Sequence, residues 1–205
     1  MATPNSITLH TPYDPDVEFI SKRPHKRIEI VESNPAWPAI FHTLEERIKA
    51  ALPADNFLYI QHVGSTSVPG FPAKDVIDID IVVPDPTNEE SYAPALEKAG
   101  FQFILREPKW HEHRFFGCEE PSANIHVFGP DSPEVVRHRL LRDWLSDSRH
   151  ESDRELYARV KRESARESRE AGETVQEYND RKEPVIRDIL KRIYEAHGLL
   201  GGTKS

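Results

Sequence analysis

Residues 57–83, FLYIQHVGSTSVPGFPAKDVIDIDIVV, predict the centre of the fold. They are typical of a buried strand, a polar turn, a Pro-Gly loop and a second buried strand. In residues 76–83, β-branched side chains fill almost every position, and this density favours a sheet interior over a helix. We therefore expect two neighbouring strands joined by a loop that carries polar groups.

Two carboxylates interrupt the second strand. Side chains alternate across a strand, so Asp78 and Asp80 share one face, roughly 6–7 Å apart. Two such carboxylates on an apolar strand are costly unless a cation compensates them. Mg²⁺ takes oxygen ligands and keeps positions for waters and substrate phosphates. The pattern predicts a magnesium site at Asp78 and Asp80, and the alternative is the solvated face of an antiparallel strand.

A glycine followed by hydroxyl residues ends the first strand. Gly64, Ser65 and Thr66 would let backbone N–H groups approach a phosphate, with the hydroxyls as further donors. An ordinary turn is the alternative. Lys74, in the loop before the acidic strand, is a further candidate for phosphate contact, with a flexible exposed lysine as its alternative.

The spacing of these features resembles a known signature. Gly-Ser, twelve residues and then Asp-hydrophobic-Asp-hydrophobic is similar to the nucleotidyltransferase superfamily signature, in which Gly-Ser holds nucleotide phosphates and the paired acids bind metal. Residues 62–79, HVGSTSVPGFPAKDVIDI, resemble more closely the GrpB block H-I-G-S-T-S/A-V-P-G-L-x-A-K-P-I-I-D-I. Further GrpB-like pieces are residues 34–38, 114–116, 125–127 and 142–145, Tyr157 with Lys161, and Tyr178 with Lys182.

The resemblance spans about residues 28–195 and implies a nucleotidyltransferase-like α+β fold. We expect a mixed sheet of about five strands with flanking helices, including a strand near residues 27–31. This core would cover residues 25–130, and a C-terminal helical bundle at residues 131–198 would pack on it. Residues 1–24 are expected to be a flexible tail and residues 199–205 a disordered one.

Two departures from the family pattern concern the site. Asp75 stands where the family usually has proline, which would add a third acid near the site. The superfamily's third carboxylate has no clear counterpart, and His126 holds the candidate position. A histidine could ligate a metal through a neutral nitrogen or contact a phosphate as a cation, but it does not replace an acid in magnesium binding. The predicted catalytic residues are Asp78, Asp80 and His126.

Arg114 lies in an aromatic strand, and its position matches a GrpB motif. A planar guanidinium suits bidentate contact with phosphate or carboxylate, so Arg114 is a candidate phosphate ligand. The alternative is a structural salt bridge to Asp78 or Asp80.

Three histidines could instead form a zinc site. His111 and His113 would share one face of an extended segment, and His126 on an adjacent strand would be the third ligand. The simpler interpretation is exposed loop histidines with one histidine facing the site.

Bulk properties narrow the class of protein. The net charge of −8 argues against nonspecific binding of nucleic acid. A single cysteine, Cys118, suits a reducing compartment and excludes a Cys-rich zinc site. The N-terminal residues lack a basic and an apolar region, and no apolar run reaches membrane length. We expect no signal peptide, no membrane contact and a cytoplasmic location.

Two classes of function remain open. The first is a nucleotidyltransferase-like enzyme that binds a nucleotide or another phosphorylated small molecule with Mg²⁺. The second is a degenerate module that binds such a ligand without turnover. Within the first class, residues 179–183, NDRKE, resemble the Asp-Asp-x-x-Glu motif of fungal cyclodipeptide synthases that use arginyl-tRNA. The acidic net charge disfavours tRNA as a partner.

Overall fold

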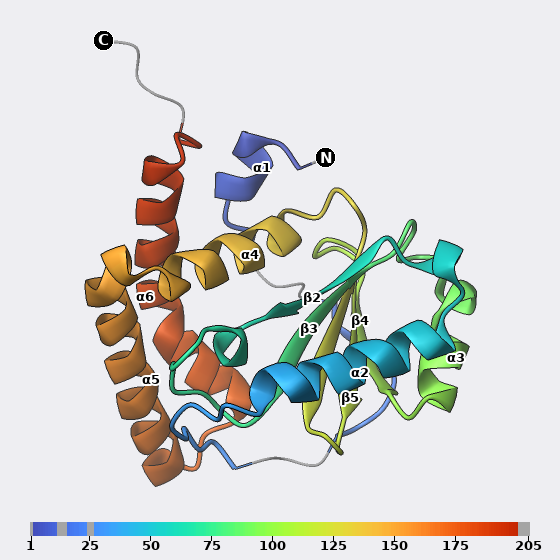
Figure 1. Cartoon of the computed structure of the whole chain (residues 1–205), viewed down its shortest axis with the longest axis horizontal. Coiled ribbons are helices and arrows are strands. Elements are labelled where there is room, and N and C mark those ends of the chain that lie inside the picture. The colour runs from blue at the N-terminus through green and yellow to red at the C-terminus, as the bar shows by residue number, and fades with distance from the viewer. Residues whose placement is uncertain (1, 12–15, 24–26, 201–205) are drawn as a thin grey trace.

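One mixed sheet organises the chain, and the computed structural model describes residues 2–11, 16–23 and 27–200. Figure 1 shows helices on one face of the sheet and a helical group at its side. The strands are β1 (Glu18–Phe19), β2 (Tyr59–Val63), β3 (Ile77–Val82), β4 (Gln102–Glu107), β5 (His113–Cys118) and β6 (Ala123–Phe128), and their spatial order is β1-β4-β5-β6-β3-β2. The expected α+β class is confirmed, and the described residues contain one strand more than the sequence suggests.

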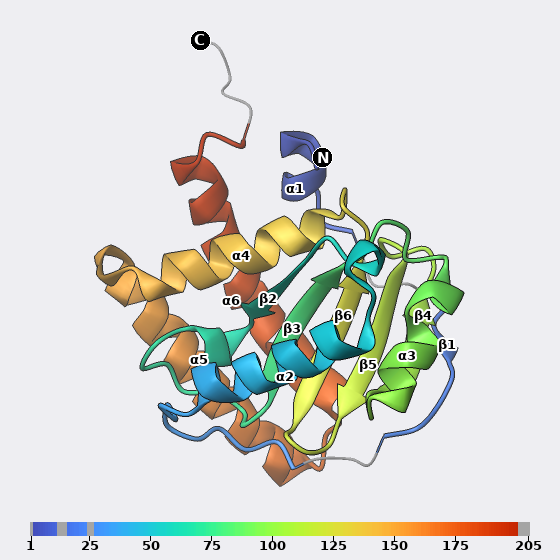
Figure 2. The same ribbon diagram turned by 45° about the vertical axis from the view of Figure 1, so that its right-hand side comes forward.

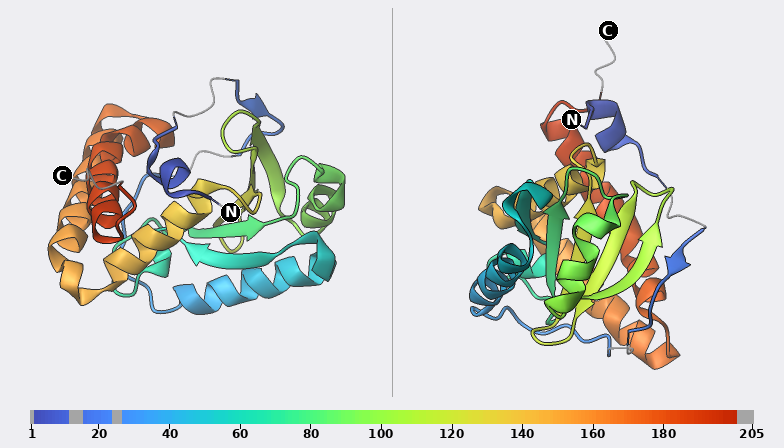
Figure 3. Two further views of the ribbon diagram at one scale, coloured as in Figure 1. Left: turned by 90° about the horizontal axis from the view of Figure 1, so that it is seen from above. Right: turned by 90° about the vertical axis from the view of Figure 1, so that its right-hand side faces the viewer.

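The helices are α1 (Pro4–Thr8), α2 (Trp37–Ala51), α3 (Ala93–Lys98), α4 (Pro133–Ser146), α5 (Glu151–Ala171) and α6 (Val175–Ala196). In Figure 2, α2 and α3 lie across one face of the sheet, and α4 crosses near one end of the strands. Figure 3 shows α5 and α6 side by side, away from α3.

The strand β3 lies next to the edge strand β2 and pairs antiparallel with it and parallel with β6. In the β3–β6 register, Asp78 lies opposite Asn124 and Asp80 lies opposite His126. Two polar residues of β6, Asn124 and His126, therefore lie beside the two carboxylates of β3.

The other face of β3 makes the main core. Ile77, Ile79 and Ile81 are almost completely buried in a cluster that includes Trp37 and Leu44 of α2. The alternation of Asp and Ile along β3 thus separates an apolar face, covered by α2, from a face that can carry polar side chains.

The turn between α5 and α6 directs the second helix back along the first. Gly172 ends α5 in the left-handed conformation, with φ of 68°, a common way for a helix to end. Thr174 and Glu177 then form a capping box at the start of α6. The resulting antiparallel pair brings Tyr157 and Lys161 of α5 and Tyr178 and Lys182 of α6 to one cavity.

The N-terminal segment, expected to be a tail, contains α1 and β1. The Arg137 guanidinium of α4 donates hydrogen bonds to Ile7 O at 2.7 Å, to Ser6 O at 2.9 Å and to Leu9 O. These bonds hold α1 against α4. Residues 1, 12–15 and 24 of the expected N-terminal tail, residues 25–26 of the expected core, and residues 201–205 of the expected C-terminal tail lie outside the described residues.

The prediction of a strand at residues 27–31 is wrong. Val31 makes a single isolated antiparallel bridge with Ala73, and the other residues of this segment pair with no strand among the described residues. Within the described part of the chain, no helix is long and apolar enough to cross a membrane.

Candidate functional site

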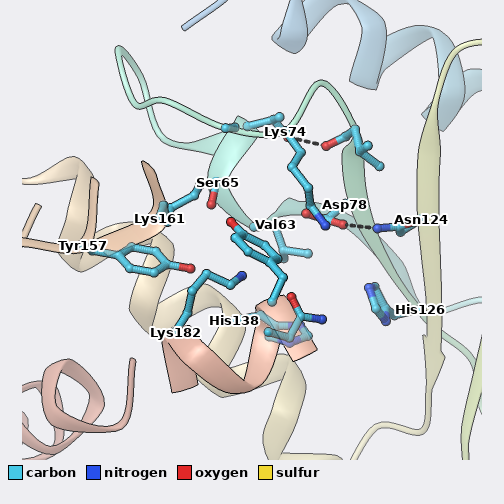
Figure 4. A pocket seen from close by; sticks show the side chains of 16 residues that line it. Val63, Ser65, Lys74, Asp78, Asn124, His126, His138, Tyr157, Lys161 and Lys182 are labelled. Carbon is cyan, nitrogen blue, oxygen red and sulfur yellow. Dashed lines mark hydrogen bonds between the residues drawn. The ribbon is translucent and has the colours of Figure 1, made fainter. Parts of the chain in front are cut away.

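A cavity of about 250 Å³ lies where the loop after β2 meets β3, β6 and the α5–α6 pair. We call it the lysine cavity. Figure 4 shows Lys74 and Lys182 extending into the space between Asp78 and Tyr157. The predicted residues that line it are Gly64, Ser65, Thr66, Lys74, Asp78 and His126.

Three lysines converge on this cavity and rest on aromatic rings. Lys182 Nζ lies 4.2 Å from the centre of the Tyr178 ring, and Lys74 Nζ lies 5.3 Å from the same centre. Lys161 Nζ donates to the Pro72 carbonyl at 2.8 Å. Lys161 is 2% exposed and Lys182 is 9% exposed. Cation–π contacts and this hydrogen bond therefore hold the ammonium groups in place before any ligand enters.

Burial makes the charges of these lysines costly. Loss of solvent, with mutual repulsion, lowers the pKa of Lys161 well below its usual range and the pKa of Lys182 to about 7. Burial also lowers the pKa of Lys74. An anion in the cavity would favour the charged form of each amine, so the arrangement favours a negatively charged ligand.

The Tyr178 hydroxyl is a second indication of a ligand. The residue is fully buried, it lines the cavity, and its hydroxyl has no hydrogen-bond partner among the described residues. Buried polar groups in proteins are nearly always hydrogen-bonded. Burial raises the pKa of Tyr178 and raises that of Tyr157 to about 12. Both phenols stay protonated at neutral pH and can donate to an anion.

Asp78 is the predicted carboxylate that reaches the cavity. Its Oδ1 accepts a hydrogen bond from Asn124 Nδ2 at 2.8 Å. Burial raises its pKa, while the Asn124 bond and the charge of Lys74 oppose that rise. Gly64 has a φ of 66°, and a Cβ there would lie 2.9 Å from Asp78 Cβ and still closer to its Oδ2. Because glycine has no side chain, this position leaves enough space for the Asp78 carboxylate.

Asp80 lies outside the lining of the cavity, although His138, its partner, belongs to that lining. Its side chain is fully buried, accepts from Gln61 Nε2 at 2.9 Å, and pairs with His138 Nδ1 of α4 at 3.0 Å. Burial alone would lower the pKa of His138, but Asp80 raises it to about 9. His138 is therefore charged at neutral pH, and the protein itself supplies a cation beside Asp80, where a Mg²⁺ ion was expected.

The structure thus brings one of the two predicted metal ligands to the cavity. Asp78 lines it, whereas Asp80 lies outside the lining. Within residues 2–11, 16–23 and 27–200, no group of three or more His, Cys, Asp or Glu residues could hold a metal ion. The donor set fits a magnesium ion less well than the sequence pattern suggests.

A chain of hydrogen bonds ends at His126, which lines the cavity. Glu107 Oε2 lies 2.7 Å from His113 Nδ1, and His113 Nε2 lies 3.0 Å from His126 Nδ1. Burial lowers the pKa of both histidines to about 3, so both are neutral. A carboxylate only accepts, so His113 carries its proton on Nδ1 and accepts from His126 Nδ1 through Nε2. This order leaves His126 Nε2 unprotonated.

The histidine arrangement differs from both sequence interpretations. His113 is 3% exposed and holds His126, so it is neither an exposed loop residue nor, with His111, part of a zinc site among the described residues. His111 instead lies with Nε2 at 3.5 Å from Glu134 Oε1.

Arg114 lies outside the lysine cavity. Its Nε donates to Glu89 Oε1 at 2.7 Å and its Nη1 donates to the Glu112 carbonyl at 2.7 Å. The structural salt bridge proposed as the alternative exists, but its partner is Glu89. Asp75 also lies outside the lining, and its carboxylate accepts from Trp37 Nε1 at 2.7 Å. Neither residue therefore adds charge to the walls of the cavity.

Comparison with known proteins identifies the family of this chain and supports its fold. The family model described as GrpB protein matches residues 27–192, which is most of the chain. The chain belongs to the GrpB family. It is 42% identical over 171 residues to the UPF0157 protein BH1888 of Halalkalibacterium halodurans, covering 83% of this chain and 85% of that protein. The crystal structure of GrpB from Enterococcus faecalis has a TM-score of 0.67 at 21% identity, covering 83% of this chain and 99% of that one. This likeness confirms the GrpB fold.

A further relative has a longer chain. A dephospho-CoA kinase of Mycolicibacterium paratuberculosis is 29% identical to this GrpB protein over 196 residues, which cover 82% of this chain and 46% of the kinase. This chain contains no Gly-x-x-x-x-Gly-Lys-Ser/Thr motif, the phosphate-binding loop of many kinases. The match therefore gives no reason to assign kinase activity to this chain.

Proposed function

We propose that this GrpB protein binds a phosphate-bearing small molecule, with its phosphates in the lysine cavity. The observation that carries the proposal is the convergence of Lys74, Lys161 and Lys182 on a cavity where the Tyr178 hydroxyl has no hydrogen-bond partner in the described part of the chain. Ammonium groups and phenol hydroxyls all donate to phosphate oxygens, and charge-assisted bonds of this kind are the stronger ones.

Local charge supports an anionic ligand although the whole chain is acidic. The net charge of the chain is −8. The lysine cavity collects three lysines against one carboxylate, Asp78, while Asp80 and His138 neutralise each other nearby. In a site of low dielectric such an excess acts strongly at short range, whereas the distant acidic surface is screened by salt.

A nucleotide is the phosphorylated ligand that the nucleotidyltransferase-like fold favours. Nucleotidyl transfer with Mg²⁺ stays a prediction from the sequence. Because Asp80 is paired with His138, Asp78 is the predicted metal ligand left at the cavity, and we derive no step through a metal. Binding, rather than transfer, is the function that the side chains support.

The resemblance to cyclodipeptide synthases concerns the same helix. Asn179 and Lys182, which belong to the NDRKE segment, line the lysine cavity. This placement makes arginyl-tRNA a suitable comparison ligand in the binding experiment, although the acidic chain disfavours it.

The test is calorimetric titration with ATP, GTP, CTP, UTP, dephospho-CoA and pyrophosphate, each with and without Mg²⁺, and with arginyl-tRNA as the comparison ligand. Lys161→Met and Lys182→Met remove one amine each from the cavity, and Lys98→Met removes one from the exposed surface of α3. We expect binding of at least one phosphate compound, weakened tenfold or more by the cavity variants and unchanged by Lys98→Met. Equal affinities in all four proteins, or no binding by the wild type, would refute the proposal. Binding that appears only with Mg²⁺ and disappears in Asp78→Asn would instead support the predicted magnesium site.

A further inference from the structure

A second cavity, of about 530 Å³, adjoins the lysine cavity. It lies between α6 and the N-terminal residues Thr8–Thr11, and Asn179 and Lys182 line both cavities. The two spaces therefore meet at the Lys182 side chain, and a single ligand of sufficient length can enter both.

The charged residues in the wall of the second cavity are largely paired with one another. Arg137 pairs with Glu134 and donates to the backbone of α1, and Arg187 Nε donates to Glu183 at 2.9 Å. The remaining wall includes apolar and aromatic side chains, namely Trp110, Ile186, Leu190 and Tyr194. The wall therefore combines an apolar and aromatic strip with charged groups that are largely paired, and a concave site of this size can hold an organic ligand with a few polar contacts.

The cavity extends along one side of α6. Lys182, Ile186 and Leu190 recur every fourth residue, so they form one stripe, and the stripe is about 12 Å long at 1.5 Å per residue. A cationic end of the stripe faces the lysine cavity, and an apolar end faces the second cavity. This order matches a ligand with an anionic end and a largely uncharged end.

The opposite wall comes from a part of the chain outside the family match. Thr8, His10 and Thr11 precede residues 27–192, which the GrpB model covers. The Arg137 bonds to the carbonyls of α1 fix this wall in place. The N-terminal segment thus adds to the family domain a surface that can select the organic part of a ligand.

We propose that the second cavity binds the nucleoside part of the same ligand whose phosphates lie at Lys161 and Lys182. The inference rests on the proposed function and adds the position of the base and ribose. Lys182, at the junction, would contact the phosphate nearest the nucleoside. Residues of α1 and α6 would then determine which nucleotide binds.

The experiment compares a ligand that needs one cavity with a ligand that needs both. Pyrophosphate fits the lysine cavity alone, whereas the four nucleoside triphosphates would extend into the second cavity. Ile186→Trp narrows the second cavity from α6, and Thr8→Trp narrows it from α1. Val185→Trp is the matched control, because Val185 is also half-buried on α6 but lies outside both linings.

We expect both narrowing variants to weaken binding of the preferred nucleoside triphosphate at least tenfold. Pyrophosphate affinity should stay within about twofold, and Val185→Trp should bind both ligands as the wild type does. Unchanged nucleotide affinity in both narrowing variants, or an equal loss for pyrophosphate, would overturn the inference while the lysine cavity stands. If the wild type binds neither pyrophosphate nor nucleotide, the proposed function fails and this inference fails with it. Because two opposite walls are altered separately, misfolding of one variant leaves the other to decide.

Discussion

His138 Nδ1 lies 3.0 Å from Asp80 Oδ2, although 58 residues separate them in the chain. The contact joins α4 to the strand β3 and neutralises a carboxylate whose side chain is 0% exposed. Removing one member of such a pair leaves an unpaired charge in the interior. We expect His138→Leu to lower the free energy of unfolding by about 3–5 kcal/mol, measured by urea denaturation. The double variant Asp80→Leu/His138→Leu should lose less, and a larger loss in the double variant would contradict the ion pair.

The same pair predicts how stability changes with pH. Asp80 raises the pKa of His138 from 6.5 to about 9 despite the opposing effect of burial. Protonation therefore favours the folded chain, and the contribution is complete below pH 6.5 and lost as the pH rises through about 9. The difference in unfolding free energy between wild type and His138→Gln should shrink over this interval. A difference that stays constant from pH 6 to 10 would show that His138 is not charged in the folded protein.

Gly64 and Gly172 offer a matched pair of substitutions. Their φ angles are 66° and 68°, so alanine should cost roughly 1–2 kcal/mol of backbone strain at either position. At Gly172 nothing lies within 4 Å of the new Cβ, whereas at Gly64 it meets Asp78. We expect Gly64→Ala to destabilise more than Gly172→Ala and, in addition, to weaken pyrophosphate binding by moving Asp78. Equal destabilisation with unchanged binding would show that Asp78 relaxes freely.

The lysine cavity predicts a pH dependence of anion binding. Burial lowers the pKa of Lys182 to about 7, and the charged amine is the form that attracts an anion. Pyrophosphate affinity should therefore fall as the pH rises from 6 to 9, with a slope approaching tenfold per pH unit above the pKa. In Lys182→Met this part of the slope should disappear, and calorimetry at four pH values measures both. The same slope in the variant would assign the titration to another group.

The sequence is informative where neighbours in the chain are neighbours in space. Alternation placed Asp78 on the polar face of β3, and the glycine before Ser65 correctly marked the turn beside it. Lys74 follows in the same local unit and lines the lysine cavity, while its contact with a phosphate stays a prediction. These features depend on strand periodicity and turn chemistry, which operate over a few residues.

The remaining features depend on distant partners. No local pattern indicates that His138 reaches Asp80 or that Arg114 pairs with Glu89. Lys161 and Lys182 lie in helices rich in charged residues and were singled out by family resemblance alone. Their convergence depends on how α5 and α6 pack beside the sheet. The pattern of apolar residues within each helix does not specify this packing. The strand β1 is two residues long, too short for any alternation to mark it.

The walls of the lysine cavity come from two parts of the chain that lie far apart in the sequence. Ser65 and Asp78 belong to the sheet and its loop, whereas Lys161 and Lys182 belong to the α5–α6 pair. A bound phosphate would connect the two parts directly and would be absent from any state in which the pair has separated. Such a ligand raises the cost of separation by RT ln(1 + [L]/Kd). Slower amide hydrogen exchange in α5 and α6 would then report occupancy of the cavity.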